Sequence, residues 1–249
     1  LAGLALRRLR ADIIANCQFT SSQWAPFLPA HRREVIYNGV EEFRYARHRS
    51  FCTPRIGCIG RIGREKGQRE FVEAARLIHR ALPACRFEVI GAPLFDDRAA
   101  VAYDAGMRGA AKGLPIDFTG WQNDVYAVLS RLDLLLVPSA SNEATTRVIP
   151  EAWAAYVPVI AFPSGGVREI VRHGENGFLA ATVAEMADFA VRSLTGDRSE
   201  TARIAAAGHT AWQGGFTLEH FAERLLASLT RSASAASTTI GRPNRQDAA

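Results

Sequence analysis

The sequence predicts an α/β fold built on a doubly wound parallel sheet. Three observations support this: continuous apolar runs of strand length, helical patterns between them, and a loop-forming or polar pair after each run. The five runs span residues 55–59, 86–90, 115–119, 133–137 and 157–161. Strands that are apolar throughout are typical of a parallel sheet covered by helices on both faces.

The segments between the runs have the apolar spacing of helices with one buried face. The recurring positions are Phe71, Ala74, Ala75 and Ile78 in one segment and Val125, Val128, Leu129 and Leu132 in another. Because helices alternate with strands along the chain, the pattern predicts a doubly wound unit over residues 55–179.

The N-terminal region precedes the predicted sheet. Residues 1–15 have the pattern of a basic amphipathic helix or its remnant. Residues 20–22, Thr-Ser-Ser, can cap a short helix. Residues 35–39 resemble a strand that ends in an Asn-Gly turn.

The C-terminal region is predicted to be helical. We expect helices over residues 183–195 and 198–212, then a last helix that Thr217 caps. That last helix has three apolar residues on one face, Phe221, Leu225 and Leu229. From Ser232 onward bulky residues are few, and we expect a disordered tail.

The composition is that of a globular protein: 249 residues, of which 48% are apolar and 22% charged. The net charge is +5, but no basic stripe is interleaved with aromatic residues, so a nucleic-acid partner is not expected. The charge fits attraction to an anionic small ligand or a membrane surface. The four cysteines show no C-x-x-C spacing, so neither a zinc site nor a disulfide framework is predicted, and a reducing cytoplasm is the simplest setting.

Two glutamates follow the fourth apolar run, Glu143 in a polar loop and Glu151 in the first turns of a helix. A carboxylate just beyond a strand's carboxyl end is well placed to accept hydrogen bonds from ligand hydroxyls. The alternative is two solvated glutamates whose charge suits the helix dipole. All loops that follow parallel strands emerge at one sheet edge, where open α/β sheets bind ligands. We therefore predict that both glutamates are site residues.

A glycine-rich turn, Gly60-Arg61-Ile-Gly63-Arg-Glu-Lys66-Gly67, follows the first run and opens a helix. It matches neither the G-x-G-x-x-G fingerprint nor a P-loop. Backbone N–H groups, the helix dipole and the cations of Arg61 and Lys66 could nevertheless bind a diphosphate. The alternative is a glycine-rich turn with solvated charges.

Several short motifs occur together in a fixed order. They are Asn38-Gly-Val40, Gly60-Arg61…Lys66-Gly67, Pro138-Ser139…Glu143-x7-Glu151-Ala, Pro158-Val-Ile and Gly165-Gly166…Glu169-Ile-Val…Asn176-Gly177. In this order and spacing the chain resembles the donor-binding, C-terminal half of a GT-B glycosyltransferase of family 4, the "glycosyltransferase group 1" type. The resemblance covers roughly residues 12–230.

The resemblance implies a Rossmann-like domain of an enzyme that transfers a sugar, with retention, from a UDP- or GDP-type nucleotide sugar to an acceptor hydroxyl. The acceptor would be a glycan or a lipid-linked glycan, met in the cytoplasm or at the inner face of the membrane. The family needs no cofactor and no bound metal, and the chain has no Asp-x-Asp.

The resemblance also assigns roles within the site. Arg61 and Lys66 would bind the diphosphate and offset its charge as it leaves. Glu143 would accept hydrogen bonds from the donor sugar and, with Arg61 and Lys66, make up the catalytic set. Glu151 would accept hydrogen bonds from the ribose. The remaining donor-binding residues would be Gly60, Gly120 at the start of the loop near the base, Thr145 and Thr146.

Two positions depart from the family pattern. Ala144-Thr145-Thr146 stands where the family usually has Gly-Phe-Gly, which leaves the identity of the sugar open. Tyr156 stands where a small residue, usually glycine, closes the helix. That position requires either a left-handed residue or a different exit from the helix.

The motifs divide the chain into three parts: residues 1–49, a remnant of the acceptor-binding domain and hinge; 50–231, the donor-binding domain; and 232–249, the tail. The first part is too short for a second Rossmann-like domain, and residue 1 is leucine. We therefore expect that most of the acceptor-binding half is missing, and that this chain alone binds nucleotide without transferring sugar.

Two other functions fit parts of the sequence. One is a nucleotide-sugar-binding module without chemistry that acts with a partner. The other is an NAD(P)-dependent oxidoreductase, which the missing G-x-G-x-x-G and the lack of an acidic residue closing the second strand disfavour. Other conspicuous residues are predicted to be structural: Glu169 binding backbone at its loop and His173 in a turn. Trp121 and Trp153 could flank a base, but we predict that they serve packing.

Overall fold

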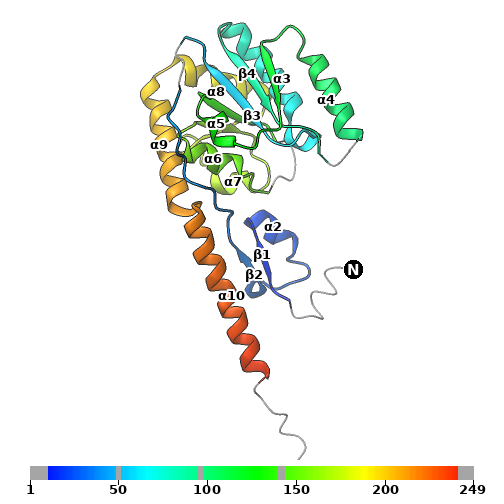
Figure 1. The fold of residues 1–249 in the computed structure, drawn as a ribbon, viewed down its shortest axis with the longest axis vertical. Helices are drawn as coiled ribbons and strands as arrows, with labels where there is room; N and C mark the ends of the chain where they lie inside the picture. The colour runs from blue at the N-terminus through cyan, green and yellow to red at the C-terminus, as the bar shows by residue number, and fades with distance from the viewer. Residues whose placement is uncertain (1–10, 49–51, 95–97, 140–143, 241–249) are drawn as a thin grey trace, which may run out of the picture.

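The computed structural model describes residues 11–48, 52–94, 98–139 and 144–240, with only the backbone for residues 234–240. Within these residues a parallel sheet of six strands has the order β5-β4-β3-β6-β7-β8 (Figure 1). The strands are β3 Arg55–Ile59, β4 Arg86–Ile90, β5 Ile116–Gly120, β6 Leu134–Val137, β7 Val159–Ala161 and β8 Phe178–Leu179. The predicted α/β fold is confirmed.

All five predicted strands exist, with small differences at their ends. The strand predicted over 157–161 begins at Val159. Pro158, just before it, has no N–H for a sheet ladder, although its carbonyl accepts a hydrogen bond from Leu135. The sixth strand, β8, was not predicted because its two residues are too few to show a pattern.

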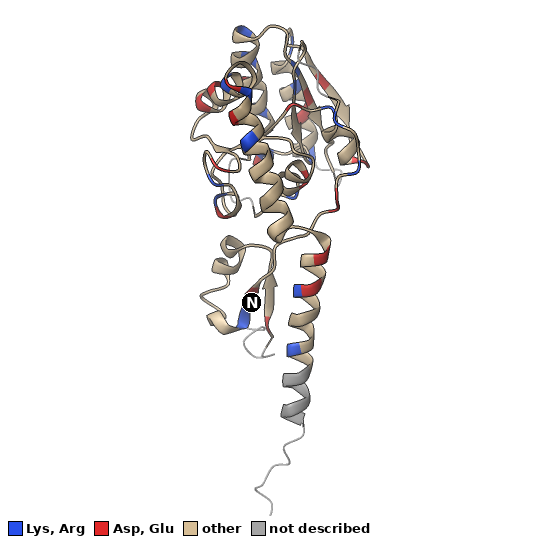
Figure 2. Cartoon of the chain, turned by 90° about the vertical axis from the view of Figure 1, so that its left-hand side faces the viewer, with Lys and Arg blue, Asp and Glu red and all other residues tan. Residues whose placement is uncertain are grey.

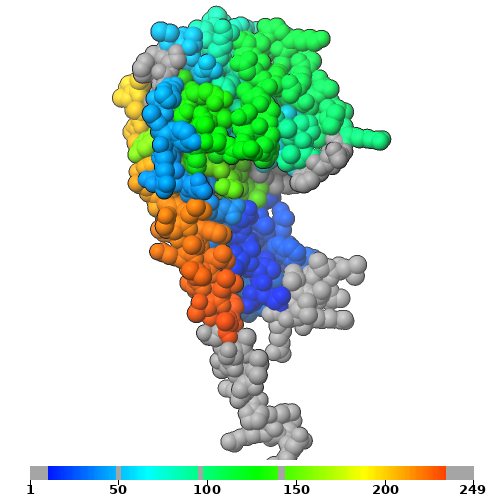
Figure 3. Space-filling model, in the orientation of Figure 1, coloured from blue at the N-terminus to red at the C-terminus, as the bar shows by residue number. Residues whose placement is uncertain are grey.

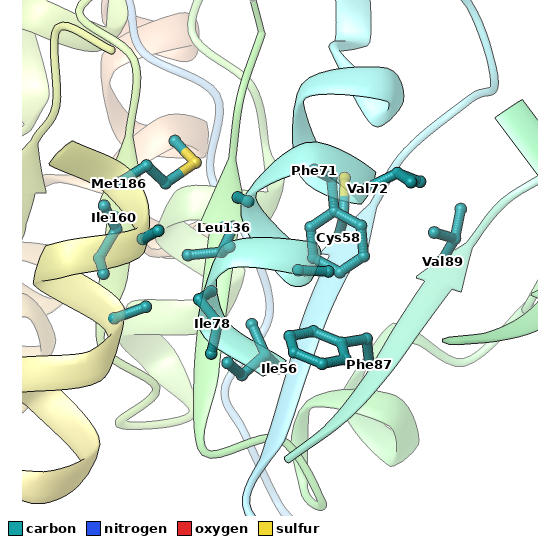
Figure 4. Packing of buried hydrophobic residues seen from close by; sticks show 14 of the residues in the cluster. Ile56, Cys58, Phe71, Val72, Ile78, Phe87, Val89, Leu136, Ile160 and Met186 are labelled. Carbon is teal, nitrogen blue, oxygen red and sulfur yellow. The ribbon is translucent and has the colours of Figure 1, made fainter. Parts of the chain in front are cut away.

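Helices cover both faces of the sheet, each over its own apolar core. One face carries α3 Gln68–Ala81, α4 Arg98–Ala110 and α8 Val183–Thr195. The other carries α5 Val125–Leu129, α6 Val148–Ala154, α7 Val167–Ile170 and α9 Arg198–Gly215. The four apolar positions predicted to form the buried face of the first helix are all fully buried in α3. In Figure 4, Phe71 and Ile78 of α3 lie against Ile56 and Phe87 of the sheet.

A small lobe precedes this domain. Its two strands, β1 Ile13–Ala15 and β2 Arg33–Val35, pair in parallel, with α2 Gln18–Gln23 and a 3-10 turn Ala30–Arg32 between them. The helix predicted over 1–15 is therefore wrong for residues 13–15, where β-branched Ile13 and Ile14 favour a strand. Residues 1–10 lie outside the described part of the chain.

Two further predictions for this lobe need correction. Residues 20–22 lie inside α2 and do not cap it; the cap is Cys17, whose sulfur accepts from the Thr20 N–H. The strand predicted over 35–39 spans Arg33–Val35, and the Asn38-Gly39 pair lies in irregular structure. The last residue of β1, Ala15, pairs with Val35, so β2 ends there as well.

The last helix, α10 Leu218–Ile240, leaves the domain that contains the six-stranded sheet and runs along the small lobe (Figure 1). As predicted, Thr217 caps it, accepting from the His220 N–H at 3.1 Å. Arg224 donates to the carbonyl of Val35 at 2.9 Å, and Ser228 donates to Glu34 at 2.7 Å. These bonds tie the helix to β2.

The prediction of disorder from Ser232 is wrong as far as Ile240, because α10 continues to that residue. The segment is rich in alanine and serine and contains no glycine or proline before Gly241. Such a sequence can extend a helix that has already started, since propagation is easier than nucleation. Residues 241–249 lie outside the described part.

Tyr156 follows α6 in the left-handed conformation, with φ of 53°. Of the two exits left open by the sequence, the chain takes the left-handed one without a glycine. The Tyr156 ring stacks on His209 of α9, with centroids 3.8 Å apart. We infer that this stacking offsets part of the backbone strain, which is of order 1 kcal/mol for a left-handed non-glycine residue.

Charged residues of both signs are interspersed on the side of the molecule drawn in Figure 2. All four cysteines are free thiols, and burial raises the pKa of Cys58 to about 12. In the described part of the chain, no helix is both long enough and apolar enough to cross a membrane.

Candidate functional site

A cavity of about 1200 Å³ opens at the edge of the sheet where the strands end. Its walls come from the ends of β3 and β4, from the loop between β5 and α5, from the start of α6, and from residues 40–45. Six of the predicted site residues line it: Gly60, Arg61, Lys66, Thr145, Thr146 and Glu151. The structure therefore brings together residues that are up to 91 positions apart.

The glycine-rich turn after β3 forms one wall. Gly60 has φ of 155°, and a β-carbon on the facing Gly91 would lie 1.9 Å from the Gly60 carbonyl oxygen. Glycine is required where two chain segments approach this closely. The Lys66 side chain passes beside Gly60, since a β-carbon there would lie 3.8 Å from Lys66 Cδ.

The sequence placed Arg61 and Lys66 at the start of a helix, but both precede α3 in the structure. A 3-10 turn, Arg64–Lys66, separates Arg61 from α3, which begins at Gln68. Gln68 supports the turn by donating to the Arg61 carbonyl at 2.9 Å. The Arg61 guanidinium pairs with Glu65, and both side chains are more than two-fifths exposed. Such a pair is weak in water, so Arg61 can exchange it for an anionic ligand.

Glu151 lies in the first turn of α6, as predicted, with its side chain 12% exposed toward the cavity. Among the described residues, none donates a hydrogen bond to its carboxylate, and the ion pair there is with Arg147 Nη2 at 3.4 Å. Burial raises the pKa of Glu151 above its ordinary 4.5, and the charge of Arg147 opposes that effect. The carboxylate therefore retains unused acceptor capacity.

The loop before α6 supplies the threonines. Thr145 is buried, and its hydroxyl donates to the Asn16 carbonyl of the small lobe at 3.2 Å. Thr146 is half-buried at the cavity wall. Glu143, the first of the two predicted glutamates, lies outside the described residues, so its predicted role in sugar binding stays a prediction.

The loop after β5 begins at Gly120, which has φ of 71°. Its carbonyl accepts a hydrogen bond from the Gly91 N–H at 2.9 Å, which joins the end of β5 to the end of β4. Gly120 itself does not line the cavity, whereas residues 121–126 do. Trp121 was predicted to be a packing residue, but the residue is 55% exposed and lines the cavity. Trp153 is fully buried, as predicted, and donates to the Asn176 carbonyl at 3.0 Å.

Sequence reasoning missed the wall formed by residues 40–45. In Figure 3 this linker lies in the blue strip beside the green part of the large domain. Tyr45 donates to Asp124, and Tyr126 of α5 donates to the Glu41 carbonyl. Burial raises the pKa of Tyr126, and the nearby carboxylates of Glu151 and Glu41 add to the rise. The aromatic residues Phe43 and Tyr45 after Asn-Gly-Val were the available signal, but nothing local shows that they fold back onto α5.

The sheet, its two layers of helices and the cavity at the carboxyl edge define a Rossmann-like α/β domain. Residues 53–196 match the sequence model of the family described as glycosyl transferases group 1, and the chain belongs to that family. The expected membership of the GT-B group 1 glycosyltransferases is confirmed, and the match weighs against the oxidoreductase alternative.

Two curated relatives share similar levels of identity with the chain. It is 30% identical to the lipopolysaccharide core biosynthesis glycosyltransferase LpsE of Rhizobium meliloti, over 71% of this chain and 50% of the relative. It is 29% identical to the GDP-mannose-dependent alpha-(1-6)-phosphatidylinositol monomannoside mannosyltransferase of Mycobacterium tuberculosis, over 76% of this chain and 54% of the relative. The chain spans about half the length of these relatives.

Solved structures show the same fold. The structure of Anabaena Alr3699/HepE in complex with UDP and glucose superposes with a TM-score of 0.80 at 23% identity, covering 92% of this chain and 65% of that one. Sucrose-phosphate synthase of Thermosynechococcus elongatus superposes with a TM-score of 0.75 at 22% identity, covering 90% and 58%.

Proposed function

We propose that this chain forms the donor site of a retaining glycosyltransferase that uses a nucleotide-diphospho-sugar of the UDP or GDP type. The observation that carries the proposal is the cavity itself. It combines Glu151, a mostly buried carboxylate with unused acceptor capacity, and a glycine turn that carries two cations, Arg61 and Lys66. Hydroxyl groups and a diphosphate are the ligand chemistry that such a set recognises.

Glu151 is proposed to bind the ribose. Both ribose hydroxyls are donors, and an ionised carboxylate is an acceptor with two oxygens. Hydrogen bonds to a charged group contribute about 1.5–3 kcal/mol each. Hydroxyl groups that donate to the ionised carboxylate would lower the pKa that burial raises.

Arg61 and Lys66 are proposed to bind the diphosphate, with the glycine backbone of their turn allowing close approach. In the transfer, the bond between the anomeric carbon and the diphosphate oxygen breaks, with its electron pair going to that oxygen. The acceptor oxygen bonds to the anomeric carbon and gives its proton to the departing diphosphate. Negative charge therefore accumulates on the departing diphosphate, where two cations stabilise it. No protein-bound metal is proposed for this step.

The other contacts follow from the loops around the cavity. The loop after Gly120, residues 121–126, is proposed to hold the base, and Thr145, Thr146 and Glu143 the donor sugar. The relatives named above act on lipopolysaccharide core and on a phosphatidylinositol mannoside. We propose by analogy a glycan or lipid-linked acceptor, met in the cytoplasm or at the inner membrane face. That these relatives are named glycosyltransferases favours an enzyme over a non-catalytic module.

The test separates phosphate recognition from nucleoside recognition. We expect that replacing Arg61 and Lys66 together by glutamine weakens UDP or GDP binding by about tenfold or more, and changes uridine or guanosine binding little. Calorimetric titration of each ligand measures the difference. Equal losses for the diphosphate and the nucleoside would contradict the proposed clamp.

A matched control is Arg172→Gln together with Glu175→Gln. Both side chains lie on the exposed turn before β8, at least 66% exposed, and pair with each other at 3.6 Å. Their loss should leave the affinity for either nucleotide unchanged.

A further inference from the structure

Glu169 of α7 connects the two lobes of the chain. It was predicted to bind backbone at its own loop, but the backbone it binds belongs to the small lobe. Its two oxygens accept from the N–H groups of Gln18 at 2.8 Å and Phe19 at 2.6 Å, in the first turn of α2. One oxygen also accepts from the Tyr37 hydroxyl at 2.8 Å. Three donors therefore converge on one carboxylate.

The N-terminus of α2 is a place where a negative charge is stabilising. The first N–H groups of any helix lack partners inside the helix and carry partial positive charge. The first turn of α2 contains no acidic residue, and its cap is the weakly accepting sulfur of Cys17, 3.3 Å from the Thr20 N–H. Glu169, which is about 150 positions away in sequence, supplies the charge that α2 itself lacks.

Two more contacts surround this bond. Thr145 donates to the Asn16 carbonyl at 3.2 Å, and a β-carbon on Gly166 would lie 3.0 Å from the Cys17 sulfur. Cys17 itself is completely buried. Residues 16–19 thus pack against Thr145, which follows β6, and Gly166, which follows β7. In Figure 1, α7 lies at the side of the large lobe that faces α2.

We propose that Glu169 is a positioning residue, a latch that holds residues 16–19 against these two loops. Because Thr145 lines the cavity, the latch fixes the wall of the site on the side of the small lobe. Only this last consequence rests on the proposed function. When the latch opens, the two lobes separate locally while the core of the large lobe stays intact.

The test uses the buried Cys17 thiol as a reporter of opening. In a Cys52→Ser background, which removes the exposed thiol, alkylation by iodoacetamide under native conditions is followed by mass spectrometry. We expect Glu169→Ala to speed the labelling of Cys17 by about tenfold or more, the equivalent of one charge-assisted hydrogen bond. Cys58 and Cys85, which are buried in the large core, should keep their rates.

Conservative variants grade the effect. Glu169→Gln should speed Cys17 labelling less than Glu169→Ala, because an amide oxygen can still accept one of the N–H groups. Tyr37→Phe removes one of three bonds and should have the smallest effect. Glu175→Ala, which removes a glutamate 66% exposed six positions away, should have none.

Two results would overturn the proposal. If the Cys17 rate in Glu169→Ala equals that of the parent, the contact does not hold the lobes together. If Cys17, Cys58 and Cys85 accelerate together, Glu169 supports global stability and positions nothing. Neither readout depends on nucleotide, so a failure of UDP and GDP to bind would refute the proposed function and leave the labelling result standing.

Discussion

Glu88 and Glu151 are both nearly buried glutamates in or beside the central sheet, but they differ in how many partners their carboxylates have. Glu88 lies within β4 with its side chain 2% exposed, and two guanidiniums bind it: Arg131 Nη2 at 2.7 Å and Arg55 Nη1 at 3.1 Å. Arg55 begins β3, and Arg131 lies shortly before β6. This carboxylate's charge is fully matched from within the chain.

Glu151, beyond the end of β6, has one ion pair at 3.4 Å, and no described residue donates a hydrogen bond to it. Burying an ionised carboxylate without donors costs free energy, and the raised pKa of Glu151 is the sign of that cost. The comparison indicates that the charge of Glu88 is satisfied within the chain, whereas Glu151 keeps acceptor capacity that the proposed ligand could use.

The largest effect is expected for Glu88. Glu88→Ala leaves two guanidiniums without their partner, and breaking a buried pair costs about 3–5 kcal/mol. Because the Arg55 and Arg131 side chains are 39% and 35% exposed, water can solvate them, and we expect the free energy of unfolding to fall by about 3 kcal/mol. Urea denaturation measures it. A loss below about 1 kcal/mol, no more than in the surface variant Glu175→Ala, would refute the contrast.

A smaller effect of opposite sign is expected at Glu151. Its folded pKa is raised, so its ionisation favours the unfolded state as pH rises through that pKa. Glu151→Gln should therefore unfold at a higher temperature than the wild type at pH 8. The difference should shrink as pH falls toward 4.5, where the wild-type carboxyl also protonates. Thermal melts at several pH values test this, and a variant less stable at pH 8 would show that the carboxylate is needed for the fold.

Much of the fold could be predicted from the sequence because the signals are local and repeated. The apolar run of β3 and the helical spacing of Phe71 and Ile78 report the side chains that the core must bury. The strands that were missed or assigned to a helix are too short to show a pattern of their own. Residues 13–15 form a strand of three residues, and β8 has two, so each depends on a neighbouring strand.

The residues of the candidate site also fall into those that the sequence could predict and those that it could not. Gly60, Lys66 and Glu151 could be assigned to the cavity because the ends of parallel strands share one edge of the sheet. The wall formed by residues 40–45 could not, because Tyr45 meets Asp124 only after the linker folds back across 79 positions. The contacts of Glu169 with Gln18 and Phe19 span about 150 positions and follow no pattern in sequence.

The most direct test of the central claim is calorimetric titration of UDP and GDP into the wild type and Glu151→Ala. The account predicts that at least one nucleotide binds the wild type with saturation, that Glu151→Ala weakens it about tenfold or more through loss of charge-assisted bonds to ribose, and that Glu175→Ala binds like the wild type. Absence of binding for both nucleotides, or equal affinity in Glu151→Ala and the wild type, would contradict it.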